Sequence, residues 1–372
     1  MPASQIQFEC GPDGRPAVFS APLALLRADS ADDVPKVLRE IDARLAAGEW
    51  IAGFASYELG YALEPRLAAL MPPVRDLPLL CFGAFGPPSV ATPAADGALP
   101  VGPLLPGWDS ARHRAATLRV LDLIAAGDIY QANLTFQVEA PVSGTPATLD
   151  AALRARQPVG EAALVEIAGL PALVSRSPEL FFATDPGGMI LTRPMKGTAP
   201  RDPDPARDRA LAETLRASPK DRAENLMIVD LLRNDLSRIC QPGSVQVPRL
   251  HAIESFATVH QMVSDVTGRL VPGTSLSRIL AALFPCGSVT GAPKIRAMEV
   301  IRDLEDGPRG IYCGSIGWAA PDGRSRFNVA IRTLTLRGGR ARFGVGGGIV
   351  ADSDPAAEYR EALWKTRFAT PA

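Results

Sequence analysis

Two pairs of acidic residues stand at helical spacing in segments that we expect to be helices. Glu358 and Glu361 lie three residues apart and Lys365 follows four residues later, so all three project from one helix face. Asp221 and Glu224 repeat this spacing in an earlier segment. Two such pairs could bring carboxylates around one Mg²⁺ ion, which favours one or two carboxylates, several waters and an anionic substrate. The simpler alternative is two ordinary solvated helix faces.

A lysine and a glutamate in the middle of the chain could act as nucleophile and general acid. Lys196 lies in the run RPMKGTAPR, between an expected strand end and a glycine turn, where burial would lower the pKa of its amine. Glu179 lies in the run SRSPELFF, directly before two aromatic residues, and apolar surroundings raise the pKa of a carboxyl group. Taken singly, either residue could be structural. Arg could not replace a lysine that must lose its proton.

Two further runs offer backbone or hydroxyl groups to a ligand. The run GVGGG (344–348) lies between β-prone segments and lacks the spacing of a dinucleotide-binding loop, so its glycines would let a ligand approach a strand. The run SVTGAPK (288–294) places hydroxyls at an expected helix start, which is either an anion site or a plain helix cap. The histidines show no metal-ligand spacing.

These groups must be positioned by strands and helices, and the hydrophobic pattern predicts both. The expected strands are 50–55 and a meander over 310–350, with 327–336 as its central strand. The expected helices are 110–127 (capped by Ser110, with Leu118 on its apolar face), 221–239, 293–304 and 355–368. Strands in series, interrupted by well-separated helices, predict an α+β fold with antiparallel sheets rather than a wound parallel sheet.

Composition and charge narrow the class of protein. The chain has 372 residues and a net charge of −1, which argues against a nucleic-acid binder. Five scattered cysteines without a C-x-x-C pair suggest neither disulfides nor zinc. The sequence shows no signal peptide and no membrane-spanning run, so we expect a cytoplasmic protein without membrane contact. The Pro- and Gly-rich segment 86–107 predicts an N-terminal region (1–105) followed by a catalytic domain (106–372).

Taken together and in this order, the motifs resemble the chorismate-binding enzyme family. The matching runs are YQAN (130–133), SRSPELFF, RPMKGTAPR, ENLMIVDL (224–231), CGSVTGAPK (286–294), RGIYCG (309–314), FNVAIRT (327–333) and GVGGGIVADSDP with its helix. They cover about residues 110–370. The resemblance implies a sandwich-like core of antiparallel sheets with helices packed outside.

The resemblance also implies a role for each candidate residue. Glu224 and Glu361 match the family's Mg²⁺ ligands, Glu358 matches a neighbouring acidic residue, and the metal would neutralise the ring carboxylate of chorismate. Glu179 matches the general acid that helps the C4 hydroxyl leave. The residues that match substrate-binding positions, partly through their backbone, are Gln131, Thr290, Tyr312, Arg332, Gly346, Gly348 and Lys365.

Two positions favour one branch of the family. Isochorismate and salicylate synthases carry a lysine base where this chain has Gln131, which cannot abstract a proton from water. Anthranilate synthases have Ala where Lys196 stands, whereas Lys in this motif marks the aminodeoxychorismate synthases. The resemblance therefore implies an Mg²⁺-dependent transferase of that branch, component I. It would make 4-amino-4-deoxychorismate for para-aminobenzoate and folate biosynthesis through a covalent intermediate on Lys196. Anthranilate synthase component I is the alternative, followed by the isochorismate and salicylate synthases.

The source of ammonia is expected to be a separate protein. No Cys/His/Glu amidotransferase pattern is present in the sequence, so ammonia would come from a glutamine amidotransferase subunit or from free ammonium. Related enzymes hold tryptophan in their N-terminal region, and the sequence leaves open whether residues 1–105 do so. An alternative of another class is a protein of this fold that binds chorismate without turning it over.

Overall fold

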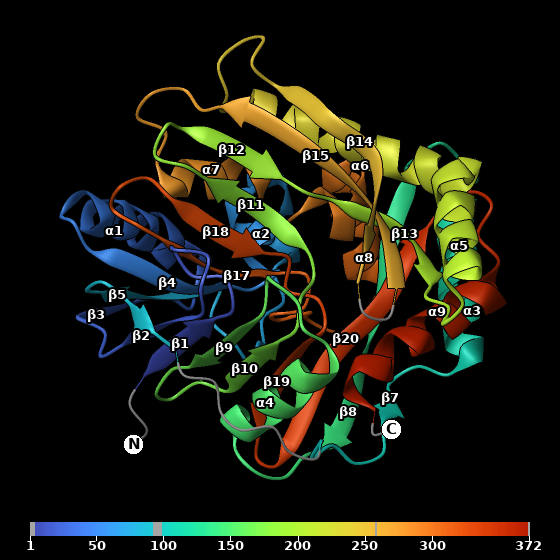
Figure 1. Cartoon of the computed structure of the whole chain (residues 1–372), viewed down its shortest axis with the longest axis horizontal. Coiled ribbons are helices and arrows are strands. Elements are labelled where there is room, and N and C mark those ends of the chain that lie inside the picture. Colours follow the sequence, from blue (N-terminus) through green and yellow to red (C-terminus); the bar gives the residue numbers. More distant parts are fainter. Residues whose placement is uncertain (1–3, 92–98, 257–258, 371–372) are drawn as a thin grey trace.

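In the computed structural model, which describes residues 4–91, 99–256 and 259–370, the chain forms two antiparallel sheets of ten strands each (Figure 1). Sheet A contains, in spatial order, β16 (Gly291–Ala292), β8 (Gln131–Pro141), β20 (Arg340–Ile349), β19 (Thr333–Arg337), β10 (Ala172–Ser175), β9 (Ala163–Glu166), β1 (Gln5–Phe8), β2 (Ala17–Ser20) and β6 (Ser89–Val90), with β7 (Leu105–Pro106) pairing with β8. Sheet B contains β13 (Met195–Pro200), β15 (Val259–Arg269), β12 (Met189–Thr192), β11 (Leu180–Thr184), β18 (Ser325–Asn328), β17 (Ser315–Ala319), β4 (Trp50–Ala55), β5 (Leu80–Phe85) and β3 (Ala24–Ala28), with β14 (Gln246–Ser255) pairing with β15. The predicted α+β class with antiparallel sheets is confirmed.

Helices cover the outer faces of the two sheets. The α-helices are α1 (Val34–Ala46), α2 (Leu59–Leu63), α3 (Ser110–Ala125), α4 (Pro146–Arg156), α5 (Pro205–Ala217), α6 (Pro219–Ser237), α7 (Leu276–Leu283), α8 (Lys294–Leu304) and α9 (Pro355–Trp364). The 3₁₀ turns are η1 (Ala31–Asp33), η2 (Pro65–Leu70), η3 (Gly287–Val289) and η4 (Lys365–Ala369). Helices α1, α2, α6 and α7 share a hydrophobic core with sheet B, whereas α3, α4 and α9 share one with sheet A.

Alternation along the strands explains why each sheet is buried on both faces. In β4, Ile51 and Ala55 belong to the core under the helices, while Phe54 belongs to a third core between the two sheets. In β10, Leu173 faces the other sheet and Val174 faces the helices. The result is four layers in the order helices, sheet B, sheet A, helices. This double burial accounts for the nearly continuous apolar run that predicts a strand at 50–55.

Two of the segments in which the chain passes from one sheet to the other lie side by side. Residues 176–179 join β10 of sheet A to β11 of sheet B, and residues 329–332 join β18 of sheet B to β19 of sheet A. The amide of Val329 donates to the carbonyl of Glu179 at 3.0 Å, which ties the two crossing segments together. Each crossing carries one of the predicted site residues at its end.

The expectation of a single strand over 327–336 is therefore wrong. Arg332 interrupts it with a left-handed φ of 50°, and the two halves pair in different sheets. The amide of Arg176 donates to the carbonyl of Arg332 at 3.0 Å, so the interruption is held by the neighbouring crossing. The hydrophobic pattern continues through the break because both halves are β-prone and buried, which is why the sequence does not show it.

Helix α3 differs in detail from its prediction. Asp109, not Ser110, caps the helix, because the carboxylate of Asp109 accepts an amide hydrogen of the first turn at 2.8 Å. The packed face holds Ala116 and Val120, whereas Leu118 is 38% exposed. The apolar periodicity therefore locates the helix and most of its buried face, since Leu121 and Ile124 pack, partly buried, against the core, and Leu118 is the exception.

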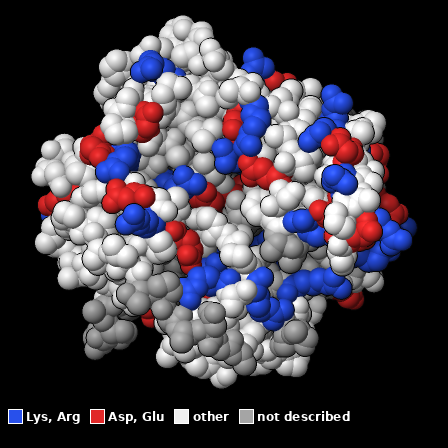
Figure 2. Space-filling view, viewed as in Figure 1, with Lys and Arg blue, Asp and Glu red and all other residues white. Residues whose placement is uncertain are grey.

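Charges are spread over the surface. Acidic and basic side chains are interspersed across most of the face in Figure 2, in keeping with the net charge of −1. Among the described residues no helix is long and apolar enough to cross a bilayer. Of the expected connecting segment 86–107, residues 92–98 lie outside the described part, and the remainder contains the two short strands β6 and β7.

Candidate active site

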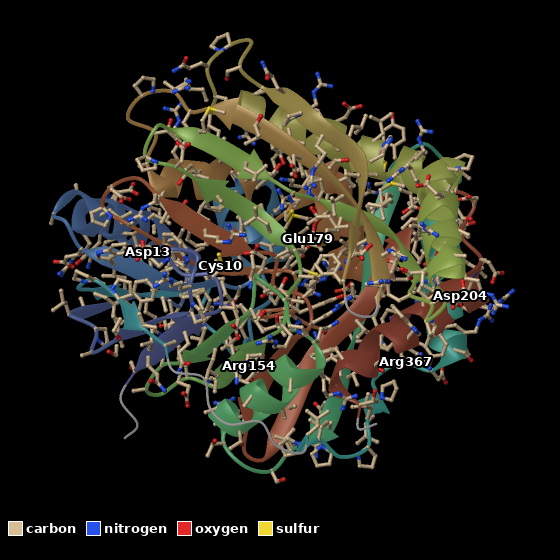
Figure 3. All side chains as sticks on the ribbon, in the orientation of Figure 1. Cys10, Asp13, Arg154, Glu179, Asp204 and Arg367 are labelled. Carbon is tan, nitrogen blue, oxygen red and sulfur yellow. The ribbon has the colours of Figure 1, made fainter. Side chains whose placement is uncertain are left out.

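One cavity of about 540 Å³ collects most of the candidate residues. Its walls come from β13 and β15 of sheet B, from β8 and β20 of sheet A, and from α6 and α9. Glu179 lies in the wall, near the middle of the molecule (Figure 3). The predicted residues that line the cavity are Glu179, Lys196, Glu224, Tyr312, Arg332, Gly346, Gly348, Glu358, Glu361 and Lys365. Gln131 and Thr290 are outside the lining.

A β-bulge in β13 displaces Lys196 from the regular strand. The pairing register of β13 with β15 shifts between Met195 and Thr198, so that Lys196 and Gly197 stand opposite the single residue Met262. Gly197 adopts a left-handed φ of 81°, a conformation that glycine reaches without steric cost. Because a bulge re-aims the side chains of its strand, it accounts for the place of Lys196 in the cavity wall.

Burial lowers the pKa of the Lys196 amine, because the ammonium form loses its hydration in the cavity wall. The carboxylates of Glu224, Glu179 and Glu361 oppose this change, while the positive charge of Lys365 adds to it. The net effect favours the neutral amine relative to an exposed lysine. A neutral amine carries the lone pair that a nucleophile needs.

Burial also raises the pKa of Glu179, to about 7. The Ser288 hydroxyl donates to Oε1 of Glu179 at 2.7 Å, which opposes the rise, as do the charges of Lys196 and Arg332. Glu179 is 4% exposed, and the Ser177 hydroxyl accepts its amide hydrogen at 3.2 Å. A carboxyl group with a pKa near neutrality can donate a proton to a leaving group at physiological pH.

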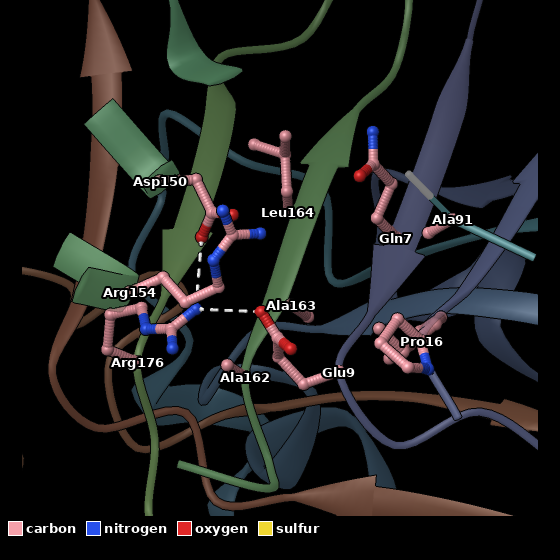
Figure 4. Close-up of a pocket in the computed structure, with 11 residues that line it drawn as sticks. Gln7, Glu9, Pro16, Ala91, Asp150, Arg154, Ala162, Ala163, Leu164 and Arg176 are labelled. Carbon is pink, nitrogen blue, oxygen red and sulfur yellow. Dashed lines mark hydrogen bonds and ion pairs between the residues drawn. The ribbon is translucent and has the colours of Figure 1, made fainter. Parts of the chain in front are cut away.

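Arg176 supports the crossing segment that ends at Glu179. Its guanidinium is 1% exposed and lies between two carboxylates, with Nη1 3.4 Å from both Glu9 Oε1 and Asp150 Oδ1 (Figure 4). Nη2 donates to the carbonyl of Gln157 at 3.1 Å. The cavity around these groups measures only about 20 Å³, enough for one water molecule. The cluster is therefore structural, and it anchors the start of the segment that carries Glu179.

The glycines of β20 give room to side chains that cross over the strand. A Cβ atom on Gly344 would lie 2.1 Å from the ring of Tyr312. A Cβ on Gly348 would lie 2.7 Å from Nε2 of Gln131 and 3.2 Å from Nζ of Lys196. Gln131 and Lys196 therefore approach the same point of β20, from sheet A and sheet B respectively.

Helix α9 and the turn after it contribute an ion pair at the cavity wall. Nζ of Lys365 lies 2.9 Å from Oε1 of Glu361 and donates to the carbonyl of Gly346 at 2.7 Å. The positive charge of Lys365 lowers the pKa of Glu361. Ser353 donates to Oε1 of Glu358 at 2.7 Å. The predicted common face of Glu358, Glu361 and Lys365 is thus the face that meets the cavity.

Helices α6 and α9 could offer only a small number of carboxylate ligands to one cation. Burial raises the pKa of both Glu224 and Glu358, and the charge of Glu358 raises that of Glu224 further. The described residues include no group of three or more His, Cys, Asp or Glu side chains placed to hold a metal ion. This donor set fits Mg²⁺, which takes one or two carboxylates and completes its shell with water and an anionic ligand.

The remaining two predicted residues lie behind the cavity wall. Gln131 is fully buried, and neither its amide oxygen nor its amide nitrogen has a hydrogen-bond partner in the described structure. The Thr290 hydroxyl donates to the backbone carbonyl of Cys286 at 3.1 Å. The run 288–294 leads into a helix as expected: η3 and β16 occupy its first part, and α8 begins at Lys294, one residue after the predicted start. Ser288, rather than Thr290, directs its hydroxyl to a candidate catalytic group.

The sequence did not identify several residues that line the cavity as catalytic or binding residues. Asn133, Lys220, Asp221 and Gln261 also line it. Only Asp221 carried a signal, its spacing from Glu224, because the others are single polar residues in mixed surroundings.

Two residues of nearby motifs have structural partners instead. His260 lies 2.9 Å from Asp208 and 2.8 Å from the Ser255 hydroxyl. Lys294 makes an ion pair of 2.7 Å with Asp235. Neither residue lines the cavity.

Replacing Gly197 with Ala is expected to destabilise the protein more than a comparable glycine replacement. A Cβ at Gly197 would lie 2.7 Å from Oδ1 of Asp221, whereas Gly273, with a φ of 78°, has nothing within 4 Å of its Cβ position. Gly273→Ala is expected to cost about 1 kcal/mol through backbone strain alone. Gly197→Ala should cost at least about 1 kcal/mol more through the added clash. Urea unfolding of both variants checks this, and equal losses would contradict the crowded bulge.

The chain is similar in sequence to known proteins. Residues 90–371 match the model of a family described as chorismate binding enzyme. Anthranilate synthase component 1 of Streptomyces coelicolor is 40% identical over 306 residues, 81% of this chain and 58% of that protein. Aminodeoxychorismate synthase component 1 of Escherichia coli is 45% identical over 249 residues, 66% of this chain and 54% of that protein. The chain thus spans little more than half the length of these relatives.

A solved structure shows the same fold. Anthranilate synthase component I from Streptococcus pneumoniae superposes with a TM-score of 0.79 at 26% identity, covering 100% of this chain and 91% of that one. The two-sheet architecture with outer helices is therefore shared along the whole chain.

Proposed function

We propose, from the premise that this chain belongs to the chorismate binding enzyme family, that it converts chorismate and ammonia to 4-amino-4-deoxychorismate. The observation that carries the proposal is a partly buried lysine, Lys196, in the same cavity as a buried carboxyl group, Glu179, whose pKa is raised to about 7. Burial favours the neutral amine and the protonated acid, which are the forms that nucleophilic attack and leaving-group protonation require. The relative named aminodeoxychorismate synthase component 1 supports this choice.

The reaction follows from these two groups in two displacements. The lone pair of the Lys196 amine attacks C2 of chorismate, the ring double bonds shift, and the C4–O bond breaks. Glu179 donates its proton to the departing hydroxyl, which leaves as water. Ammonia then attacks C4, the double bonds shift back, and the C2–N bond to Lys196 breaks. The extra proton on the incoming nitrogen returns to Glu179. Two moderate steps thus replace one difficult displacement.

The polar groups around the cavity suit a substrate with two carboxylates. Arg332 offers a planar fork of donors that matches a carboxylate, and burial around it strengthens such a bond. Tyr312 lines the same cavity and could donate its hydroxyl, because burial keeps the phenol protonated. Lys365 and the backbone of Gly346 and Gly348 complete the set that we assign to substrate binding.

Mg²⁺ is the cation that we assign to the carboxylates of Glu224 and Glu361, with Glu358 beside them. A bound Mg²⁺ would neutralise the ring carboxylate of chorismate and polarise the ring toward attack. Without it, three glutamates and an anionic substrate would share one cavity, and their repulsion would weaken binding. Gln131, whose buried amide has no hydrogen-bond partner among the described residues, lies behind the cavity wall and approaches Lys196 beside Gly348.

Ammonia is proposed to come from a separate glutamine amidotransferase. The name of the Escherichia coli relative, component 1, implies a second subunit in that protein. Free ammonium should replace that subunit in a purified reaction. The product would then serve as the precursor of para-aminobenzoate for folate.

One experiment distinguishes this function from the alternative of anthranilate synthesis, which the Streptomyces coelicolor relative represents. The protein is incubated with chorismate, ammonium and Mg²⁺, and the products are separated and identified by mass. We expect a product in which an amino group replaces a hydroxyl and which a pyruvate-eliminating lyase converts to para-aminobenzoate. Fluorescent anthranilate formed without any lyase would favour the alternative, and isochorismate would favour the water-adding branch. Bound but unreacted chorismate would indicate an inactive binding protein.

Glu224→Gln is expected to raise the Mg²⁺ concentration needed for half-maximal activity by at least about tenfold, because one anionic oxygen ligand is lost. Asp230→Asn is the matched control on the same helix, since the Asp230 carboxylate is 59% exposed and pairs with Arg233 outside the cavity. It should leave the Mg²⁺ requirement within about twofold. Removing Mg²⁺ with EDTA should abolish turnover. An unchanged Mg²⁺ requirement in Glu224→Gln would remove Glu224 from the metal site.

A further inference from the structure

The bulge that carries Lys196 is joined to its neighbouring strand by one side chain. Gln261 of β15 stands opposite Thr198 in the pairing register. Nε2 of Gln261 donates to the carbonyl of Gly197 at 2.9 Å, and the hydroxyl of Thr198 donates to Oε1 of Gln261 at 3.1 Å. The two bonds lie directly beside the point where the bulge disrupts the strand pairing.

The chemistry of these two bonds requires a carboxamide. The carbonyl of Gly197 needs a donor and the hydroxyl of Thr198 is satisfied by an acceptor, and glutamine supplies both from one planar group. A carboxylate in the same place would accept from Thr198 but would face the carbonyl of Gly197 with a second acceptor. An alanine methyl group in this place would leave the Gly197 carbonyl and the Thr198 hydroxyl either bonded to water or without a hydrogen bond.

The other side of the bulge is closed by α6. The Asp221 carboxylate stands 2.7 Å from the position that a Cβ of Gly197 would occupy. Gly197 is thus confined between Asp221 on one side and the Gln261 amide on the other. The residue directly before it is Lys196, so these contacts limit where the lysine backbone can move.

We propose that Gln261 is a positioning residue, whose carboxamide holds the β13 bulge so that the Lys196 amine stays at the reacting position in the cavity. Its role concerns the chemical step, since a small displacement of a nucleophile from its attack geometry slows the reaction strongly. The kinetic part of this inference rests on the proposed function, whereas the structural part does not. Gln261 also lines the cavity, so direct binding of substrate by its amide is the competing role.

The test compares Gln261→Ala and Gln261→Glu with the wild-type protein in two measurements. In the chorismate and ammonium reaction, kcat should fall by about tenfold in Gln261→Ala and by more in Gln261→Glu, with KM for chorismate within about twofold. Backbone hydrogen exchange, followed by mass spectrometry in the peptide around 193–200, should become at least about tenfold faster in both variants. Each measurement is made at a temperature where the variants remain folded.

Gln241→Ala is the matched control. The Gln241 amide donates to the carbonyl of Leu270 at 3.3 Å, a bond of the same kind outside the cavity lining. This variant should leave kcat and the exchange of the 193–200 peptide unchanged within about twofold. A rise in KM at constant kcat would show that Gln261 binds substrate instead, and unchanged exchange in Gln261→Ala and Gln261→Glu would show that it does not hold the bulge. Either result overturns the proposal. If the wild type made no aminodeoxychorismate, the proposed function would fail while the exchange comparison would still decide the role of Gln261.

Discussion

Lys196→Ala is expected to lower the rate of aminodeoxychorismate formation by about 10³-fold or more, because it removes the nucleophile of the first displacement. Lys196→Arg should be equally inactive, since a guanidinium stays protonated and has no free lone pair. Binding of chorismate should persist in Lys196→Ala, because the groups that we assign to the substrate carboxylates are untouched. Product formation is measured with chorismate, ammonium and Mg²⁺, and binding by calorimetry with the same components.

Lys36→Ala is the control for this experiment, because Lys36 is an exposed residue of α1 outside the cavity. It should behave as the wild type does. Turnover of Lys196→Ala within about tenfold of the wild type would exclude a covalent role. Loss of chorismate binding in Lys196→Ala, with the fold intact by circular dichroism, would instead make Lys196 a binding residue.

Glu179→Gln is expected to lower kcat by about 10²-fold to 10⁴-fold, the usual contribution of a general acid, since an amide cannot protonate the leaving hydroxyl.

The pH dependence of kcat follows from the direction in which the pKa of Glu179 is shifted. The pKa of Glu179 is about 7, so the carboxyl group is protonated below neutrality and the rate should fall as the pH rises through this value. Lys196 acts in the opposite sense, because its amine must be deprotonated, so a bell-shaped profile of kcat is expected.

The apparent pKa values of that profile belong to Glu179 and Lys196 as an interacting pair. In Glu179→Gln the fall of kcat on the alkaline side should disappear, while the acid side remains. Glu139→Gln is a suitable control, because Glu139 is a surface carboxylate of β8 that pairs with Arg340. An alkaline limb that survives in Glu179→Gln would assign it to another group.

The strands and helices were predictable where one physical signal dominated. The apolar run at 50–55 and the stripe of Val229, Leu232 and Leu236 in α6 gave elements that the structure contains, because burial on a sheet or helix face requires those patterns. The strand over 327–336 failed because a change of sheet leaves no mark in hydrophobicity. The break is held by a backbone hydrogen bond to the carbonyl of Arg332, which the amide of the distant residue Arg176 donates.

The candidate site, too, could be predicted from the sequence only in part. Glu179 and Lys196 could be singled out by residue type and by the motifs around them, and both line the cavity. Their strands are not neighbours, since β12 and β15 stand between β11 and β13, so no spacing in the sequence predicts their approach. Gln261 was missed for a related reason. Its function depends on which residue lies opposite it across the strand pair, and that register is set by the bulge.

The paired crossings have a mechanical consequence for the site. Each sheet would be able to slide on its partner through the core between them, but both crossings span that interface at the same place and are hydrogen-bonded to each other. Glu179 ends the first crossing beside β11 of sheet B, whereas Arg332 ends the second beside β19 of sheet A. The hydrogen bonds between the crossings therefore oppose a shear of the layers that would change the separation of these two residues. Lys196 lies in β13 at the edge of the same sheet B. The separation of nucleophile and acid is therefore set within sheet B, and sliding of the two layers past each other would leave it largely unchanged.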